Sequence, residues 1–324
     1  MLARPLARLA AVLALAAALT LVAAIAGCGS DGDRPTPAPG LAPPTVGVQL
    51  HVSRFAVPAG SEVQHCYYFK LPSDVDLEVV RFEIAYLPGS HHMNLFRTTT
   101  DYPDHDEDCF TPMDFSTPTN PGGVDLIVGS QSEALDWKIP DGVGYKLAAR
   151  TQLVLQTHYV NASTQQSSLN AGEVWVNLHA AADPTTIKAH VGTMFANNMQ
   201  IKIPPHSSVS FETGCSLPQD VNVIAATGHF HSRGKTFEIR ACPSDMRAPD
   251  ATPFYQSQAW NEPPFKVLDQ PIPLKAGGGL DYTCSFVNDG TDTIVFGPHV
   301  ETQEHCNLFA YFYPWEEPHA RYCF

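Results

Sequence analysis

The 324 residues are enough for about two domains, and they carry a formal net charge of −14 at pH 7. The balance of 33 Asp and Glu against 19 Lys and Arg argues against nucleic acid as a partner, because neutralising phosphates needs a basic face. Only 16% of residues are charged and 44% are hydrophobic, which excludes a disordered acidic tail. The 28 prolines and 22 glycines favour short strands over long helices.

The chain begins with a pattern typical of an export signal. Arg4 and Arg8 precede an almost wholly apolar run, residues 9–26, and Cys28 follows it closely. A secretory signal usually ends in an A-x-A-like site, whereas a Cys after small residues resembles a bacterial lipobox. We therefore predict that residues 1–27 are a lipoprotein signal peptide and that Cys28 is lipidated. An uncleaved membrane helix is the alternative, because the run is long enough to span a bilayer.

Residues 28–45 are rich in Pro, Gly and Asp and have no apolar period, as in a tether. No second run of 18 apolar residues follows, so we expect contact with the membrane through the N-terminal lipid only. This predicts an extracytoplasmic protein, lipid-anchored to a bacterial membrane. Gly29, rather than Asp, follows the lipidated Cys and favours the outer membrane over the inner one.

From Val46 onward the pattern is one of short strands between turns, and no segment has a helical period over three turns. We predict an all-β fold, a sandwich or a barrel. Asp183-Pro184 follows a predicted strand near the midpoint and indicates two domains, residues 46–183 and 184–324. The predicted strands are 79–87, 151–160, 174–178, 221–227, 236–240, 293–296 and 308–313.

The cysteines after Cys28 contain no CxxC pair, which disfavours a Cys-rich zinc site. Cysteines outside the cytoplasm usually form disulfides. Seven cysteines most simply form three disulfides and leave one free thiol. These cysteines are Cys66, Cys109, Cys215, Cys242, Cys284, Cys306 and Cys323.

Two histidine clusters in the first half are candidate metal ligands. His91 and His92 follow a Pro-Gly turn, and neighbours on an ideal strand point to opposite faces. Both reach one metal only if the turn bends the backbone or the strand ends there. His158 lies on a predicted strand and shares a face with Gln156.

Two further clusters lie in the second half. His229 and His231 form an i, i+2 pair, which on a strand makes a two-nitrogen clamp for a metal. Either His299 or His305 can supply a third ligand. Imidazoles without a thiolate cluster suit Cu, Zn, Ni or Fe, and affinity alone favours Cu(II). We interpret the remaining histidines, at 51, 65, 105, 179, 190, 206 and 319, as surface or structural.

Four motifs together resemble the copper type II, ascorbate-dependent monooxygenases, the group of peptidylglycine α-hydroxylating monooxygenase and dopamine β-monooxygenase. The resemblance runs from about Cys66 to Cys323, and Ile203-Pro204-Pro205 also fits it. It implies two tandem jelly-roll-like β-sandwich domains, with a copper site on each, facing a shared wet cleft. The motifs are HHM at 91–93, LQTHY at 155–159, HFH at 229–231 and CNLF at 306–309.

The resemblance also implies the site and its partners. It assigns an electron-transfer copper to His91, His92 and His158. It assigns an oxygen-binding copper to His229, His231 and His305, the expected catalytic residues. Two copper ions per chain are then reduced by ascorbate or another one-electron reductant, and O2 and a small molecule are the substrates. The implied disulfides are Cys66–Cys109, Cys215–Cys323 and Cys284–Cys306, which leaves Cys242 unpaired.

This chain departs from the family at the oxygen site and at the substrate site. The family has a Met where this chain has His305. An imidazole is a harder donor than a thioether and favours Cu(II), so we expect a lower potential. The Arg and Tyr with which peptide-amidating members bind a carboxylate are replaced by Thr227 and Phe309, whereas Asn307 remains. A glycine-extended peptide is therefore not expected, and Phe309 favours an apolar or aromatic substrate.

Three hypotheses follow. The first is a copper monooxygenase that hydroxylates a C–H bond of a small organic substrate. The second is a non-catalytic lipoprotein for copper capture or redox sensing, which His305 favours. The third is a zinc or iron hydrolase or oxygenase, in which Glu301 or Glu304 supplies a carboxylate base. The substrate, the physiological reductant and the oligomeric state stay open.

Overall fold

The computed structural model describes residues 40–110, 114–115, 120, 122–163, 165 and 169–324. Residues Thr36–Phe324 form one compact unit. The predicted signal peptide, Cys28 and most of the predicted tether lie outside the described residues. Within the described ranges, no helix is both long enough and apolar enough to cross a membrane. We call residues 40–183 the N-terminal half and residues 184–324 the C-terminal half.

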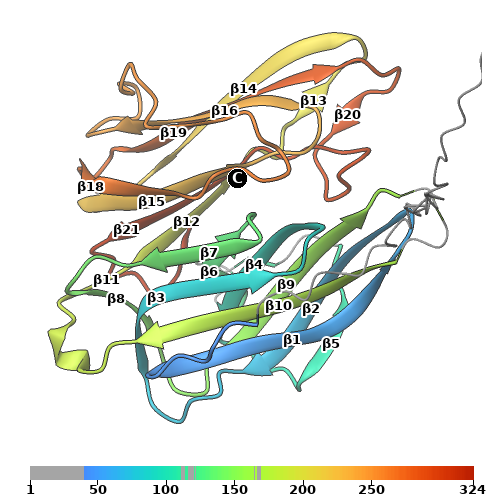
Figure 1. The fold of residues 1–324 in the computed structure, drawn as a ribbon. Helices are drawn as coiled ribbons and strands as arrows, with labels where there is room; N and C mark the ends of the chain where they lie inside the picture. The colour runs from blue at the N-terminus through green and yellow to red at the C-terminus, as the bar shows by residue number, and fades with distance from the viewer. Residues whose placement is uncertain (1–39, 111–113, 116–119, 121, 164, 166–168) are drawn as a thin grey trace, which may run out of the picture. The chain divides into compact units, whose positions relative to one another are not determined.

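Two sheets form the N-terminal half, and residues Ala189–His190 of the C-terminal half add an edge strand to the first (Figure 1). The first has the order β1 (Gly47–Pro58), β10 (Leu169–Ala180), β3 (Leu77–Tyr86), β8 (Val143–Leu147) and β11 (Ala189–His190), with β7 (Ala134–Lys138) also paired to β3. The second has the order β5 (His105–Asp108), β2 (Ser61–Lys70), β9 (Gln152–Asn161), β4 (Ser90–Thr98) and β6 (Val124–Ser130).

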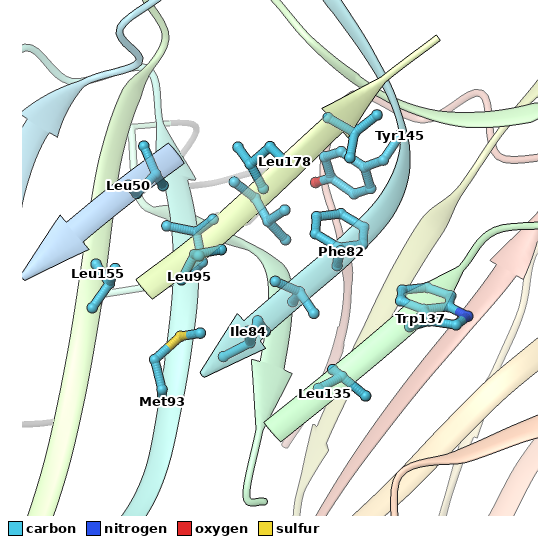
Figure 2. Close-up of a cluster of buried hydrophobic side chains, with 14 of the residues drawn as sticks. Leu50, Phe82, Ile84, Met93, Leu95, Leu135, Trp137, Tyr145, Leu155 and Leu178 are labelled. Carbon is cyan, nitrogen blue, oxygen red and sulfur yellow. The ribbon is translucent and has the colours of Figure 1, made fainter. Parts of the chain in front are cut away.

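A shared apolar core joins these two sheets. In β3, Phe82 and Ile84 are buried, whereas Arg81 and Glu83 beside them are partly exposed, as the period of a half-buried strand requires. Figure 2 shows Ile84 near Met93 of β4 and Phe82 near Tyr145, in a cluster that also includes Leu155 of β9. Burying one such side chain contributes about 1.5–3 kcal/mol, so this core stabilises the sandwich.

The C-terminal half contains three sheets. One has the order β18 (Lys266–Leu274), β15 (Val221–His229), β21 (Asn307–Tyr313), β12 (Gly192–Asn197) and β22 (Arg321–Cys323). The sheet β14 (Ser207–Ser216), β19 (Gly279–Asn288), β16 (Gly234–Cys242) and β17 (Tyr255–Ser257) packs on it through a second apolar core. The third pairs β13 (Lys202–Ile203) with β20 (Ile294–Val295).

A third apolar cluster connects the two halves. Phe96 of β4 packs in it with Phe195 of β12 and Phe309 of β21. A hydrogen bond adds to this contact, because the backbone N–H of Gly129 donates to the Tyr311 hydroxyl at 3.0 Å. These contacts bring the second sheet of the N-terminal half against the sheet that carries β15 and β21.

The predicted all-β class is confirmed, and each predicted strand overlaps an observed one. Among the described residues the only helix is a 3-10 turn, η1 (Pro184–Thr186), which begins at the predicted domain division. That division stays a prediction, since β11 after it pairs with β8 before it. The three implied disulfides are present, and Cys242 is the free cysteine in the described part of the chain.

Candidate metal centre

The six histidines assigned from the sequence to two copper sites form a single cluster. The ring of His91 lies 5.2 Å from that of His158 and 4.8 Å from that of His229, centroid to centroid. The ring of His231 lies 4.5 Å from that of His305. The wet cleft that the resemblance implied between the two sets is therefore closed here. The phenylalanine contacts between the halves hold the histidines of the N-terminal half against those of the C-terminal half.

A backbone irregularity lets both His91 and His92 reach the cluster. The register of β4 against β9 shifts between Ser90 and His92, and His92 is then paired with His158. The rings of His91 and His92 are 5.3 Å apart instead of lying on opposite faces. Neighbouring histidines can reach one metal only if the backbone bends between them, and this register shift supplies that bend.

The other pair lies at a strand end. His229 is the last residue of β15, and His231 lies beyond it, with buried Phe230 between them. The Glu304 carboxylate fixes this loop by accepting hydrogen bonds from the backbone N–H groups of His231 and Arg233, both at 2.8 Å. Since both of its oxygens are used by the main chain, Glu304 is not oriented as a base towards the cluster. Glu301 is exposed.

Four rings have one nitrogen held by a neighbour, and Nε2 of His92 lies 3.3 Å from Oε1 of Gln156. Nε2 of His158 donates to Glu62 at 2.7 Å, and Nδ1 of His231 donates to the Gln303 carbonyl at 3.0 Å. Nδ1 of His229 lies 2.5 Å from Oε1 of Gln131, and the Gln131 amide nitrogen donates to the Gly228 carbonyl at 3.0 Å. That second bond fixes the orientation of the amide, so His229 is the donor.

In the rings of His158, His229 and His231 the opposite nitrogen has no partner in the part of the chain that the structure describes. Among the described residues, buried imidazole nitrogens without a hydrogen bond are Nε2 of His91, His229 and His231 and Nδ1 of His158 and His305. Each orphaned buried polar group costs about 1–3 kcal/mol. A ring whose far nitrogen is held by a carboxylate or carbonyl, with the near one free, is the usual state of a metal-ligating histidine. The donor set therefore fits a metal.

Burial keeps five of the six rings neutral near pH 7. Burial, with repulsion between the rings as a further cause, lowers the pKa of His91, His92, His229 and His305 well below the ordinary value. Burial lowers the pKa of His231 to about 3, although its bond to Gln303 opposes this. Neutral imidazole is the form that binds metals.

The nitrogen positions define two overlapping groups. The ligand atoms of His91, His92 and His158 lie within 4.8 Å of one another, and so do those of His91, His229 and His231. His91 belongs to both groups. The His305 ring adjoins the second group, whereas His299 faces Glu62, with Nδ1 3.4 Å from a carboxylate oxygen. An all-nitrogen set of this kind suits Cu, Zn, Ni or Fe.

Sequence reasoning missed the residues that orient the rings. Glu62, Gln131 and Gln303 are separated from their histidine partners by 96, 98 and 72 positions. Glu62 also accepts a hydrogen bond from the backbone N–H of Val300 at 3.1 Å, so it joins the two halves. No local motif marks such residues, because the fold alone brings them to the rings.

A cavity of about 100 Å³ adjoins the cluster. Its lining includes three of the histidines and all three candidate substrate residues from the sequence: His92, His229, His305, Thr227, Asn307 and Phe309.

Comparison with known proteins adds one specific match. Residues 188–324 match the sequence model described as copper type II ascorbate-dependent monooxygenase, C-terminal domain. No curated protein matches the chain significantly.

Solved structures give only weak likenesses. The STIV MCP is 8% identical with a TM-score of 0.34, over 82% of this chain and 96% of that chain. PBCV-1 VP54, fitted into a reconstruction of the virophage Sputnik, is 6% identical with a TM-score of 0.23, over 82% of this chain and 93% of that chain. TM-scores this low establish neither a shared fold nor a shared function.

Removing the Glu62 carboxylate tests its role in orienting His158. Burial raises the pKa of Glu62, but hydrogen bonds from His158 and Val300 outweigh it and leave that pKa below its ordinary value. We expect Glu62→Gln to weaken metal affinity by about 10–100-fold, the usual effect of losing such a partner. Competition with a chelator measures this affinity. The exposed Glu301→Gln is the matched control, and equal affinities for both variants would contradict the assignment.

Glu304 predicts a pH-dependent contribution to stability. Burial raises its pKa to about 7, although backbone N–H groups of Arg233, His231 and His305 oppose this. A carboxyl whose folded-state pKa is raised contributes stability below about pH 4.5 that is lost as pH rises through 7. The stability advantage of the natural chain over Glu304→Gln should therefore shrink by roughly 2 kcal/mol between pH 5 and pH 8.

Urea unfolding of the metal-free protein at the two pH values measures this difference. Glu301→Gln, beside it in sequence but exposed, should show no such trend. An advantage over Glu304→Gln that is constant with pH would mean that Glu304 is ionised throughout.

Proposed function

We propose that this chain is a copper monooxygenase. The premise is the match of residues 188–324 to the copper type II ascorbate-dependent monooxygenase C-terminal domain. The chain hydroxylates a C–H bond of a small organic substrate. One atom of O2 enters the C–H bond and the other leaves as water, with two electrons from ascorbate or another one-electron reductant and two protons. The observation that carries the proposal is the set of five buried imidazole nitrogens without hydrogen bonds, found among the described residues.

We assign two copper ions to the cluster. His91, His92 and His158 hold one, and His229, His231 and His305 hold the other. Bound copper supplies one-electron redox chemistry and reactivity with O2. A harder imidazole in place of a thioether lowers the potential expected at the His305 site.

The chain supplies the positioning around these ligands. Gln303 and Gln131 keep the protons of His231 and His229 on Nδ1, so that both Nε2 lone pairs face the cluster. Glu62 keeps the proton of His158 on Nε2 and leaves Nδ1 free. Burial of the rings excludes bulk water, which limits loss of reactive species to solvent.

A second candidate function is copper capture or redox sensing without catalysis. His305 favours it, because three imidazoles stabilise Cu(II) against reduction. The adjoining cavity favours the enzyme, since a storage site has no need of space beside its metal. A zinc or iron hydrolase is disfavoured, because the Glu304 carboxylate is occupied by backbone N–H groups.

We also propose that the chain is exported and lipid-anchored through Cys28. Three disulfides support an oxidising compartment, where such bridges persist.

Ascorbate-driven oxygen uptake by the copper-loaded chain tests the catalytic proposal. We expect uptake to fall at least about 100-fold in His231→Ala, because this removes a ligand of the oxygen site. His51→Ala, on the exposed edge of β1, is the matched control and should keep full activity. Tight copper binding by the natural chain without oxygen uptake would contradict the catalytic proposal and favour copper capture.

Replacing His305 by Met tests the unusual ligand. A thioether is a softer donor, so His305→Met should raise Cu(I) affinity, by about tenfold or more, relative to the natural chain. Competition with a Cu(I)-specific chromophoric chelator measures the change. An unchanged Cu(I) affinity would show that residue 305 is not a ligand.

A further inference from the structure

The cavity beside the histidine cluster has an uncharged wall that is rich in phenylalanine. No Asp, Glu, Lys or Arg lines it among the described residues. Its volume of about 100 Å³ is of the order of an apolar cavity that holds benzene, about 150 Å³. A single ring fits this space. The aromatic part of the lining consists of Phe96, Phe110, Phe115, Phe195, Phe296 and Phe309.

Four of these rings form a continuous surface. Phe195 stacks on Phe309 at 4.8 Å between centroids, and Phe115 lies 5.0 Å from Phe195. Phe96 lies 6.3 Å from Phe115. Aromatic side chains favour a ligand that is itself an apolar ring, through offset or edge-on contacts.

Two asparagine acceptors in this wall have no hydrogen-bond partner within the described ranges. Asn197 and Asn307 both line the cavity, and their side chains are only 7% and 4% exposed. The Oδ1 atom of each is buried without a hydrogen-bond partner. A buried acceptor left unpaired costs about 1–3 kcal/mol, so a ligand that donates an O–H or N–H here restores that free energy.

The two acceptors are in line with a histidine of the cluster. Asn197 of β12 is the register partner of Asn307 of β21, and Asn307 is the register partner of His229 of β15. The three residues therefore form a row across adjacent strands. A donor group held by the two asparagines lies next to the oxygen-site ligands, with its ring against the phenylalanines.

We propose that the cavity binds an uncharged single-ring aromatic molecule that carries one hydroxyl or N–H donor, and that this class is the substrate of the site. The assignment of this class as substrate rests on the proposed function. The two asparagine oxygens accept the donor, and the phenylalanine rings hold the aromatic ring. A carboxylate or an ammonium group has no opposite charge in this wall and loses its hydration on entry, so it is rejected.

Four probes separate these requirements: 4-methylphenol, toluene, benzoate and benzylamine. Calorimetric titration of the full-length chain, metal-free and then copper-loaded without reductant, measures each dissociation constant. We expect 4-methylphenol to bind about tenfold tighter than toluene, which has the same ring and methyl group but no donor. Benzoate and benzylamine should bind at least about tenfold more weakly than 4-methylphenol.

Asn307→Leu removes one acceptor and should reduce the preference for 4-methylphenol over toluene towards equality. Asn197→Leu is the second variant, in case the first does not fold. Asn222→Leu is the matched control, because it makes the same change on β15 outside the cavity and should leave the preference intact.

Equal binding of toluene and 4-methylphenol, tighter binding of benzoate or benzylamine, or no binding of any probe would overturn the proposal. So would an unchanged preference in both folded asparagine variants. The metal-free titration needs no oxygen chemistry. Selective phenol binding without ascorbate-driven uptake would therefore reject the proposed function and retain the selectivity of the cavity.

Discussion

Desolvation of the imidazole rings is the constraint on which the centre depends. Five buried ring nitrogens lack hydrogen bonds in the described part of the chain, and every such group opposes folding. The same burial lowers the pKa of His91, His229, His231 and His305, so that protons cannot satisfy these four rings near pH 7. A bound metal satisfies these nitrogens, because it takes their lone pairs and the rings stay unprotonated.

Hydrogen bonds from one half to the other assemble the centre. Gln131 of the N-terminal half orients His229 of the C-terminal half, and Glu62 orients His158 while it accepts from the Val300 backbone. The Phe195–Phe309 stack lies at the same junction. The C-terminal half therefore lacks one orienting partner of its ligands, whereas the N-terminal half contains Glu62 together with His158. The cavity depends on the same junction, because its wall takes phenylalanines from both halves.

Local patterns in the sequence predicted what depends on local physics. Alternation in residues 79–87 predicted β3, and the i, i+2 spacing of His229 and His231 predicted a pair of adjacent rings. The motif resemblance predicted the disulfides and is matched over residues 188–324. The neighbouring histidines required a bend, which the register shift between Ser90 and His92 supplies. The closure of the implied cleft and the orienting residues were not predictable, because they arise from contacts between distant strands. Glu304 illustrates the limit: its position suggested a base, but its contacts are to the backbone.

X-ray absorption at the copper edge of the copper-loaded, reduced full-length chain tests the central claim most directly, since it reports metal content and ligand type on one sample. The account predicts two copper ions per chain, each surrounded by imidazole nitrogen with no sulfur scatterer, and loss of copper when His91 and His229 are both replaced by Ala. A sulfur ligand, fewer than one copper per chain, or full retention of copper in that double variant would contradict it.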